Sequence, residues 1–233
     1  MRIVSWNCAV ASQENIDRLM DLNPDIAVVP ECSRANIDGL KATGRSAFWV
    51  GEQDSKGLGV VAGDGWELVP RTDNMADLKT VAAFDVHGSL DFTLIAVWTH
   101  STTSYRGYAQ ELHAIAAHPE WFKAGPVVLA GDLNSNSRWD AECKPNDHSK
   151  FVGLMRSLGL ESSYHFLNHE EQGAETRCTH HHHWKEDKGF HLDYVFVPAA
   201  WLKRISRVEI GTYAQWERAS DHCPVTVDLR ECD

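Results

Sequence analysis

Polar residues that can do chemistry lie at the ends of short apolar runs throughout this chain. Each run is typical of a buried strand, and such strands bring the side chains at their ends to one rim of a sheet, where a ligand crevice can form. A single Asp or Asn at a strand end is more often a turn former, so the prediction depends on the repetition of the pattern. The residues at these positions are Asn7, Glu31, His100, Asp132, Asn134, Asp193, Asp221 and His222.

The charge balance limits what such a crevice could bind. The 233 residues include 22 Lys and Arg against 33 Asp and Glu, a formal net charge of −11. An acidic surface repels phosphate backbones, which argues against tight binding of duplex nucleic acid. Clustered carboxylates are what a hard divalent cation requires, so the composition is compatible with a cation-dependent enzyme.

The chain length and patterning predict one domain over residues 1–233, because no linker or repeat divides the sequence. Hydrophobic residues make up 43% of the chain, which is enough for a core and excludes extensive disorder. The chain has neither the apolar stretch of a secretory signal nor the roughly 20 apolar residues of a membrane span, which predicts a cytoplasmic protein. The six cysteines form no C-x-x-C pair and are predicted to be reduced and structural.

Short apolar runs and helical spacings alternate along the sequence. Strands joined by short turns indicate hairpins, and helices outside mixed sheets indicate an α+β layered sandwich. The spacing of apolar residues predicts helices over residues 13–22, 105–118 and 149–158. Strands are predicted over residues 2–6, 26–29, 47–50, 57–62, 66–69, 80–86, 92–98, 127–130, 192–197, 207–210 and 225–229.

Five segments together resemble the endonuclease/exonuclease/phosphatase superfamily, which includes DNase I-like nucleases and phosphatases. The most specific combination is Gly-Asp-Leu-Asn at 131–134 followed by Ser-Asp-His-Cys-Pro at 220–224. The resemblance implies a four-layer αββα sandwich and divalent-metal-dependent hydrolysis of phosphoesters. The matching segments are residues 2–7, 24–31, 129–134, 192–196 and 220–225.

The roles implied for the metal-binding residues agree with the chemistry of their side chains. Glu31 supplies an anionic oxygen ligand, and Mg²⁺ or Mn²⁺ suits an oxygen site with few protein ligands and several waters. Asp221 is a candidate second ligand, directly or through water. Asn7 can orient Glu31 or donate to a phosphate oxygen.

The remaining polar residues have implied catalytic roles. Asp132 and Asn134 lie two residues apart, so on an extended segment they face the same way, Asp132 to accept a proton from the attacking water and Asn134 to donate to a phosphoryl oxygen. His222 resembles the family's active-site histidine, and Asp193 the carboxylate that orients it. His100 is a candidate general acid or phosphate donor. Asp132 and His222 are both candidates for the base, and Asp132 is assigned that role.

The chain departs from the family pattern after the first strand, and it has a loop of its own. The contact that many abasic-site nucleases have at the position of Ala9 is missing, which argues against two metals and against abasic-site specificity. Residues 180–183 are four consecutive histidines, which on a loop cannot all face one ion. We interpret this loop as contacting the substrate, with a solvated surface loop as an equal alternative. The candidate substrate-binding residues in this loop and in the one after Asn134 are Asn136, Arg138, Arg177, His180 and Trp184.

The sequence therefore predicts a Mg²⁺- or Mn²⁺-dependent phosphodiesterase, most simply a nuclease that binds DNA or RNA weakly. Two alternatives stay open at this point. One is a phosphatase or phosphodiesterase acting on a small molecule or a lipid headgroup, and the other is an inactive binding module. No protein partner is indicated.

Overall fold

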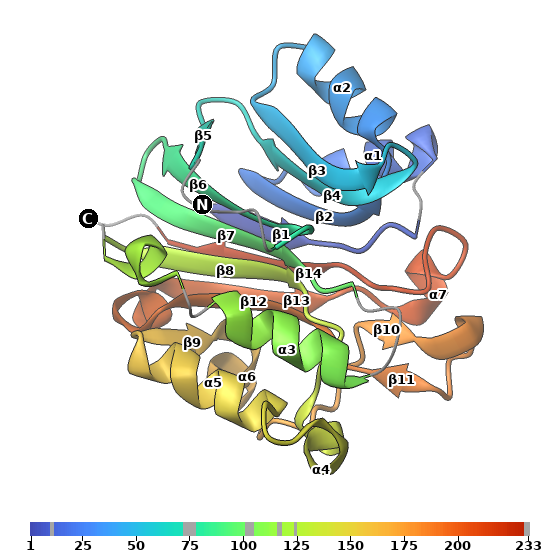
Figure 1. Ribbon diagram of the computed structural model, residues 1–233. Helices are drawn as coiled ribbons and strands as arrows, with labels where there is room; N and C mark the ends of the chain where they lie inside the picture. Colours follow the sequence, from blue (N-terminus) through green and yellow to red (C-terminus); the bar gives the residue numbers. More distant parts are fainter. Residues whose placement is uncertain (10–11, 72–77, 101–104, 116–117, 124, 231–233) are drawn as a thin grey trace.

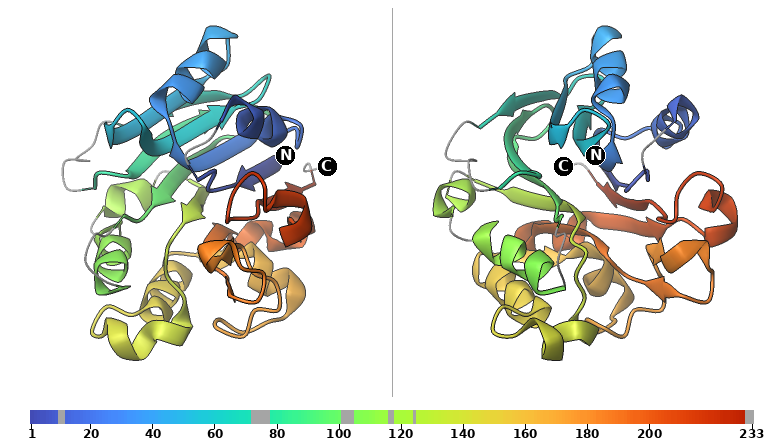
Figure 2. Two further views of the ribbon diagram at one scale, coloured as in Figure 1. Left: turned by 90° about the vertical axis from the view of Figure 1, so that its right-hand side faces the viewer. Right: turned by 45° about the vertical axis from the view of Figure 1, so that its right-hand side comes forward.

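The computed structural model places two β-sheets face to face between outer layers of helices (Figure 1). It describes residues 1–9, 12–71, 78–100, 105–115, 118–123, 125–230. Helices α1 and α2 cover one outer face, and α3 and α5 cover the other, as the turned views in Figure 2 also show. The predicted α+β four-layer αββα sandwich is confirmed. The single-domain organisation of residues 1–233 stays a prediction.

The first sheet has six strands in the order β13-β14-β1-β2-β4-β3. Strands β1 and β2 run parallel, so both end at the same edge of this sheet. The other pairs described in this sheet are antiparallel. The strands are β1 (Arg2–Ser5), β2 (Ile26–Cys32), β3 (Ala47–Gln53), β4 (Lys56–Ala62), β13 (Ile205–Ile210) and β14 (Val225–Leu229).

The second sheet also has six strands, in the order β5-β6-β7-β8-β12-β9. Here β7 and β8 run parallel, while β12 runs antiparallel to β8. The end of β8 therefore lies beside the start of β12. The strands are β5 (Glu67–Pro70), β6 (Val81–His87), β7 (Phe92–Trp98), β8 (Val127–Asp132), β9 (Leu160–Ser162) and β12 (Asp193–Pro198).

Helices and a small hairpin complete the structure. The hairpin, β10 (His180–His181) with β11 (Gly189–Phe190), contains the four consecutive histidines. The α-helices are α1 (Gln13–Met20), α2 (Arg34–Ala42), α3 (Tyr105–Ile115), α4 (Asp140–Cys143), α5 (His148–Ser157), α6 (Ser163–Asn168) and α7 (Tyr213–Trp216). The 3₁₀ turns are η1 (Pro119–Phe122), η2 (Ser137–Trp139), η3 (His182–Trp184) and η4 (Ala199–Arg204). Among the described residues, none of the helices could span a bilayer.

Two apolar clusters hold the layers together. One includes side chains from both sheets and from α1 and α2, and the other packs the second sheet against α3 and α5. Trp6 and Trp98 are buried, whereas Trp49 is half-buried against the first cluster. Cys8, Cys32, Cys143 and Cys223 are buried, and Cys232 lies outside the described residues.

The predicted strands all form, with ends that lie at most three residues from those observed. The predicted helix over 105–118 ends at Ile115, and residues 116–117 lie outside the described chain. Helix α2 was not predicted, because Ile37 is its one buried residue and Gly39 lowers its helix propensity. Its start is set by a capping box in which Ser33 and Asn36 satisfy each other's backbone N–H groups.

Candidate active site

Both sheets bring polar strand ends to one place. In the second sheet, Asp132 at the end of β8 pairs directly with Asp193 at the start of β12. In the first sheet, Asn7 follows β1 and His222 precedes β14, two strands that pair antiparallel. The Asn7 side chain donates to Asp132 Oδ2 over 2.9 Å, which joins the two sheets at this point.

Asp132 is held as a hydrogen-bond acceptor on several sides. Besides Asn7, the Asn134 side chain donates to Oδ2 (3.0 Å) and the Asn134 backbone N–H donates to Oδ1 (2.9 Å). Asn134 takes a left-handed backbone conformation with φ 44°, which turns its amide back onto Asp132. Gly131 makes this close approach of strands feasible, because a Cβ there would lie 1.7 Å from the carbonyl oxygen of Val97. The carboxylate is fully buried.

His222 and Asp193 form a buried pair beside Asp132. The His222 Nδ1–Asp193 Oδ2 distance is 2.8 Å, and the side chains are 6% and 0% exposed. The His222 backbone is fixed because Trp6 Nε1 donates to its carbonyl (2.9 Å) and its own N–H donates to Ser220 Oγ (2.9 Å). The Nε2 side of the ring is therefore the side left for a substrate.

Asp132 and His222, the two candidates for proton transfer, have pKa values that their surroundings shift to different ranges. Burial and the charge of Asp193 raise the pKa of Asp132 to about 7, against the opposing effects of His222 and the Asn7 amide. Burial alone would lower the pKa of His222, but the charge and hydrogen bond of Asp193, together with Asp132 and Asp221, raise it to about 10. At neutral pH His222 is therefore a cation and a donor, while Asp132 can accept a proton.

Asp221 lies next to this pair and contacts the histidine-rich hairpin. Its Oδ2 atom is 3.6 Å from His180 Nε2, and although burial opposes the effect, His180 and His222 lower the pKa of Asp221. The His180 ring packs against His222 with centroids 4.5 Å apart. Of the four consecutive histidines, His180 thus reaches the site, whereas His182 and His183 are exposed.

The carboxylate oxygens of Asp132 and Asp193 suit a divalent cation, whereas His222 offers no ligand atom while it is protonated. The ligand atoms of Asp132, Asp193 and His222 all lie within 4.8 Å of one another. Asp193 Oδ1 is buried and accepts no hydrogen bond, so it has capacity for a cation or a donor. The ligands predicted from sequence are arranged differently: Glu31 pairs with Lys56, Asn7 with Asp132, and Asp221 with His180.

His100 lines a cavity, and Glu31 contacts Lys56, another residue of the cavity wall. Glu31 sits at an irregularity in the pairing of β2 with β4 and has a left-handed φ of 60°. Such a bulge re-aims a side chain, and the carboxylate meets Lys56 Nζ at 2.8 Å. His100 is exposed, packs against Trp98 with centroids 4.8 Å apart, and lines the cavity with Lys56.

The predicted substrate-binding residues have different positions. Arg138 is exposed with its guanidinium 5.4 Å from the ring centre of Phe190, and Arg177 is exposed on the preceding loop. Trp184 is 46% exposed, and its carbonyl accepts a hydrogen bond from Tyr213. Asn136 is buried, and its amide is turned away from solvent into a polar network.

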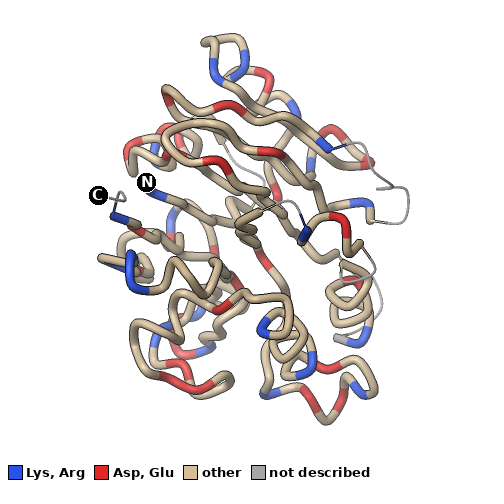
Figure 3. Tube along the Cα trace, turned by 90° about the vertical axis from the view of Figure 1, so that its left-hand side faces the viewer, with Lys and Arg blue, Asp and Glu red and all other residues tan. Residues whose placement is uncertain are grey.

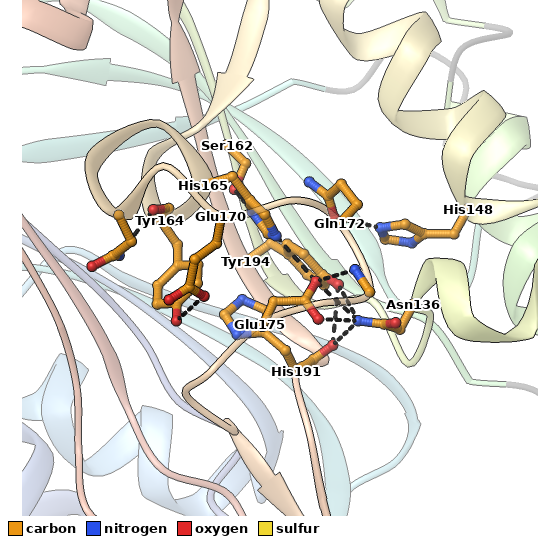
Figure 4. Close-up of polar contacts among 12 residues, drawn as sticks. Asn136, His148, Ser162, Tyr164, His165, Glu170, Gln172, Glu175, His191 and Tyr194 are labelled. Carbon is orange, nitrogen blue, oxygen red and sulfur yellow. Dashed lines mark hydrogen bonds and ion pairs between the residues drawn. The ribbon is translucent and has the colours of Figure 1, made fainter.

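That network lies behind the rim and ties three loops together (Figure 4). Glu175 is at its centre, accepting from Asn136 Nδ2 (3.1 Å), the Gly173 N–H (2.8 Å) and His165 Nε2 (3.0 Å). Burial opposes ionisation, but the hydrogen bonds from His165 and the backbone lower the pKa of Glu175 to about 2. Asn136 also holds the backbone at Arg138 in place, because Asn136 Oδ1 accepts a hydrogen bond from the Arg138 N–H.

The buried His148 in this network predicts acid sensitivity of the fold. Burial lowers the pKa of His148 to about 4, below its ordinary 6.5. The unfolded chain therefore takes up a proton first as the pH falls, so stability is full above pH 6.5 and decreases down to pH 4. We expect His148→Gln to flatten the dependence of the free energy of unfolding on pH by about 1 kcal/mol per pH unit in this range. Urea unfolding at pH 7.5, 6 and 5 measures this, and identical slopes for both proteins would contradict it.

Sequence reasoning missed several residues that shape the site. Thr99 accepts the Asn134 amide through its carbonyl, and Ser220 donates to the Asn7 carbonyl. Lys56 gave no signal because a lone lysine after a turn is typical of any solvated hairpin. Glu175 could have been found only from its partners, which are distant in sequence.

Comparisons with known proteins agree with this architecture. No family model and no curated protein matches the chain. Among solved structures, a 3′ phosphatase, NExo, from Neisseria bound to a product DNA hairpin superposes with a TM-score of 0.75 at 20% identity, covering 98% of this chain and 99% of that one. This chain has the DNase I-like fold.

Two further solved structures share that fold. TDP2 from D. rerio in complex with a single-strand DNA product matches with a TM-score of 0.66 at 15% identity, over 97% of both chains. The endonuclease domain of TRAS1, a telomere-specific non-LTR retrotransposon, matches with a TM-score of 0.66 at 16% identity, over 99% of this chain and 98% of that domain. The resemblance inferred from the motifs is thus confirmed for the fold.

Proposed function

We propose that this chain is a divalent-cation-dependent phosphoester hydrolase that cleaves phosphodiester bonds by in-line attack of water. The observation that carries the hydrolase chemistry is the buried cluster of Asp132, Asp193 and His222 at the rim shared by both sheets, where one polar side-chain atom of each residue lies within 4.8 Å of the others. The DNase I-like neighbours include a 3′ phosphatase and an endonuclease domain, which supports the same chemistry here.

The residues of the cluster have different proposed roles in the hydrolysis. Asp132 accepts a proton from the attacking water, for which a pKa of about 7 is suited. The water oxygen bonds to phosphorus as the bond to the leaving oxygen breaks. His222, held as a cation by Asp193, donates to a phosphoryl oxygen, and Asn7 has a second amide N–H for the same purpose. Both amide N–H groups of Asn134 are engaged by Asp132 and the Thr99 carbonyl, so a direct contact of Asn134 with phosphate would require one of these bonds to be exchanged. Asn134 and Asn7 also keep Asp132 in place.

Glu31 and Asp221 are the proposed ligands of Mg²⁺ or Mn²⁺, with Asn7 near them. A bound cation supplies positive charge that stabilises the phosphoryl group and the leaving oxygen. His100, Arg138, Arg177, His180 and Trp184 are proposed to contact the rest of the substrate. Asn136 keeps only an indirect part in substrate binding, because its amide is buried in the Glu175 network.

The charge distribution favours weak binding of nucleic acid. In the view of Figure 3, Lys and Arg alternate with Asp and Glu along the chain instead of gathering in one basic band. With a formal charge of −11, the protein repels polyphosphates except where a cation or a local lysine compensates. We therefore propose DNA or RNA as a substrate that the bound cation helps to hold. The cytoplasmic location stays a prediction of the sequence.

The substrate class is tested with the purified protein and a panel of phosphoesters. Plasmid DNA, single-stranded DNA, RNA and phosphomonoesters, including inositol phosphates, are incubated with Mg²⁺, with Mn²⁺ or with EDTA. We expect cleavage of at least one nucleic acid with either cation and none in EDTA. Hydrolysis of monoesters alone would replace the nuclease by a phosphatase, and no hydrolysis of any substrate would contradict the proposal.

A further inference from the structure

Lys56 is the cation nearest to the carboxylate that we propose as a metal ligand. Its Nζ lies 2.8 Å from Glu31 Oε2, and the two side chains are 37% and 21% exposed. The ammonium group also lies 5.4 Å from the ring centre of Trp98. A cation between a carboxylate and an indole face is restricted in its position, and Lys56 is the first residue of β4.

Lys56 lines a cavity of about 260 Å³ that opens beside Glu31. Aromatic and charged side chains share its wall, and no step proposed above uses it apart from the contact with His100. The charged or aromatic lining residues are Glu52, Lys56, Lys79, Trp98, His100 and Glu111.

The carboxylates on the far wall of the cavity already have partners. Glu52 pairs with Lys79 at 2.7 Å, and Glu111 accepts the backbone N–H of His100 at 2.7 Å. Burial also raises the pKa of Glu111, which favours its neutral form. Lys56 therefore differs from Lys79, because its partner Glu31 is also a proposed ligand of the divalent cation.

Glu31 has a limited capacity for positive charge. If its carboxylate ligates a divalent cation, it neutralises the Lys56 ammonium less, and Lys56 is left against Trp98 at the mouth of the cavity. An unpaired, half-buried ammonium is satisfied by an anion, and phosphate oxygens are suitable acceptors. Because Lys56 contacts the carboxylate that would hold the cation, the anion would lie next to the phosphate that the cation binds.

We propose that Lys56 binds a second phosphate group of the substrate in this cavity, beside the phosphate that is hydrolysed. The inference rests on the proposed function, because it takes Glu31 as a metal ligand. It explains how an acidic protein selects a polyphosphate: one local lysine becomes available when the cation binds. Substrates with two neighbouring phosphates, either oligonucleotides or small bisphosphates, are then preferred over those with one.

Equilibrium binding tests this without turnover. Thymidine 3′,5′-bisphosphate is titrated against the Mn²⁺-loaded protein and compared with thymidine 5′-monophosphate and thymidine 3′-monophosphate. We expect the bisphosphate to bind about tenfold more tightly than either monophosphate, as one charge-assisted hydrogen bond predicts. In Lys56→Met that preference should disappear. A matched control is Lys41→Met, which removes an ammonium 5.5 Å from the ring centre of Phe48, and it should keep the preference.

A Mn²⁺ titration of the protein alone tests the competition for Glu31. We expect Lys56→Met to bind Mn²⁺ several-fold more tightly than wild type, by about 1 kcal/mol, because Glu31 loses a competing cation. Lys79→Met removes a charge from the same cavity without touching Glu31, and its effect should be smaller. Equal effects of the two variants, or no tightening in Lys56→Met, would contradict the competition.

Turnover distinguishes the two sources of the second phosphate. The dinucleotide d(TpT) is compared with its 5′- and 3′-phosphorylated forms, and inositol 1-phosphate with inositol 1,4-bisphosphate. Preference for a phosphorylated dinucleotide, lost in Lys56→Met, identifies an oligonucleotide, and preference for the inositol bisphosphate identifies a small molecule. If wild type and Lys56→Met show the same bisphosphate preference in binding and in turnover, the proposal is wrong. If binding follows the proposal but nothing is hydrolysed, the cavity site stands and the proposed function fails.

Discussion

Replacing Asp132 by asparagine is expected to reduce kcat for phosphoester hydrolysis by about a thousandfold, the scale of a lost general base. The substitution keeps the size of the side chain, but the amide accepts no proton from water. It also places an N–H group against the Asn7 and Asn134 donors, which now point at Asp132 Oδ2 over 2.9 and 3.0 Å. The variant should fold, because removing a buried carboxylate beside Asp193 offsets part of the lost hydrogen bonding.

Steady-state kinetics on a single-stranded oligonucleotide measure this effect. Thermal unfolding followed by circular dichroism shows whether the variant is folded. Asp91→Asn is the matched control, because it makes the same acid-to-amide change far from the rim, at a side chain that is 74% exposed. A folded Asp132→Asn protein with a rate within tenfold of wild type would show that another group accepts the proton.

His222→Ala is expected to lower kcat by a similar factor of about a thousand and to destabilise the protein by about 3 kcal/mol. The activity falls because the cationic donor to the phosphoryl oxygen is lost. The stability falls because Asp132 and Asp193 are left buried with no positive charge beside them. His222→Gln retains an N–H donor, so it should recover part of the activity but little of the electrostatic stabilisation.

A double-mutant cycle separates these contributions. Asp193→Asn alone should cost less activity than His222→Ala, because the hydrogen-bond partner of the Asp193 carboxylate in the cluster is His222, at 2.8 Å, and the imidazole itself remains in this variant. The two changes together should therefore cost little more than His222→Ala alone. His87→Ala, at a side chain 51% exposed, controls for the loss of a histidine. Additive effects would mean that Asp193 contacts the substrate or the cation directly.

Much of the rim could be predicted because strand ends are visible in the sequence. The apolar runs before Asn7 and Asp132 predicted buried strands, and the polar residues after them meet where the two sheets meet. Asp193 and His222 were paired by resemblance to a family, and the structure places them in direct contact. The polar residues at strand ends can be predicted locally, because each one directly follows or precedes a short apolar run in the sequence.

The loops could not be predicted in the same way. Asn136 looked like a substrate contact because it follows the Gly-Asp-Leu-Asn segment, yet its amide meets Glu175, His191 and Tyr194. These partners lie 39 to 58 residues away, and their contacts form only once the sheets are assembled. Lys56 and Glu31 were likewise separated in sequence and joined by the pairing of β2 with β4.

The histidine run is an intermediate case. Its composition predicted a loop, and the chemistry of four adjacent imidazoles argued against one shared ion. The structure puts His180 against His222 because β10 reaches the segment before β14, where the two residues form an isolated bridge. His182 and His183 follow the turn out to solvent, whereas His181 is buried. The sequence named His180 as the candidate of this run, but periodicity alone does not predict its contact with His222.

The most direct test of the central claim is the rate of phosphodiester cleavage by EDTA-treated protein as Mg²⁺ or Mn²⁺ is added back, measured for wild type and His222→Ala. We expect a background rate in EDTA, recovery of wild type with either cation, and recovery of the variant to no more than about a thousandth of the wild-type rate at any cation concentration. Full activity of wild type in EDTA, or equal recovery of the two proteins, would contradict it.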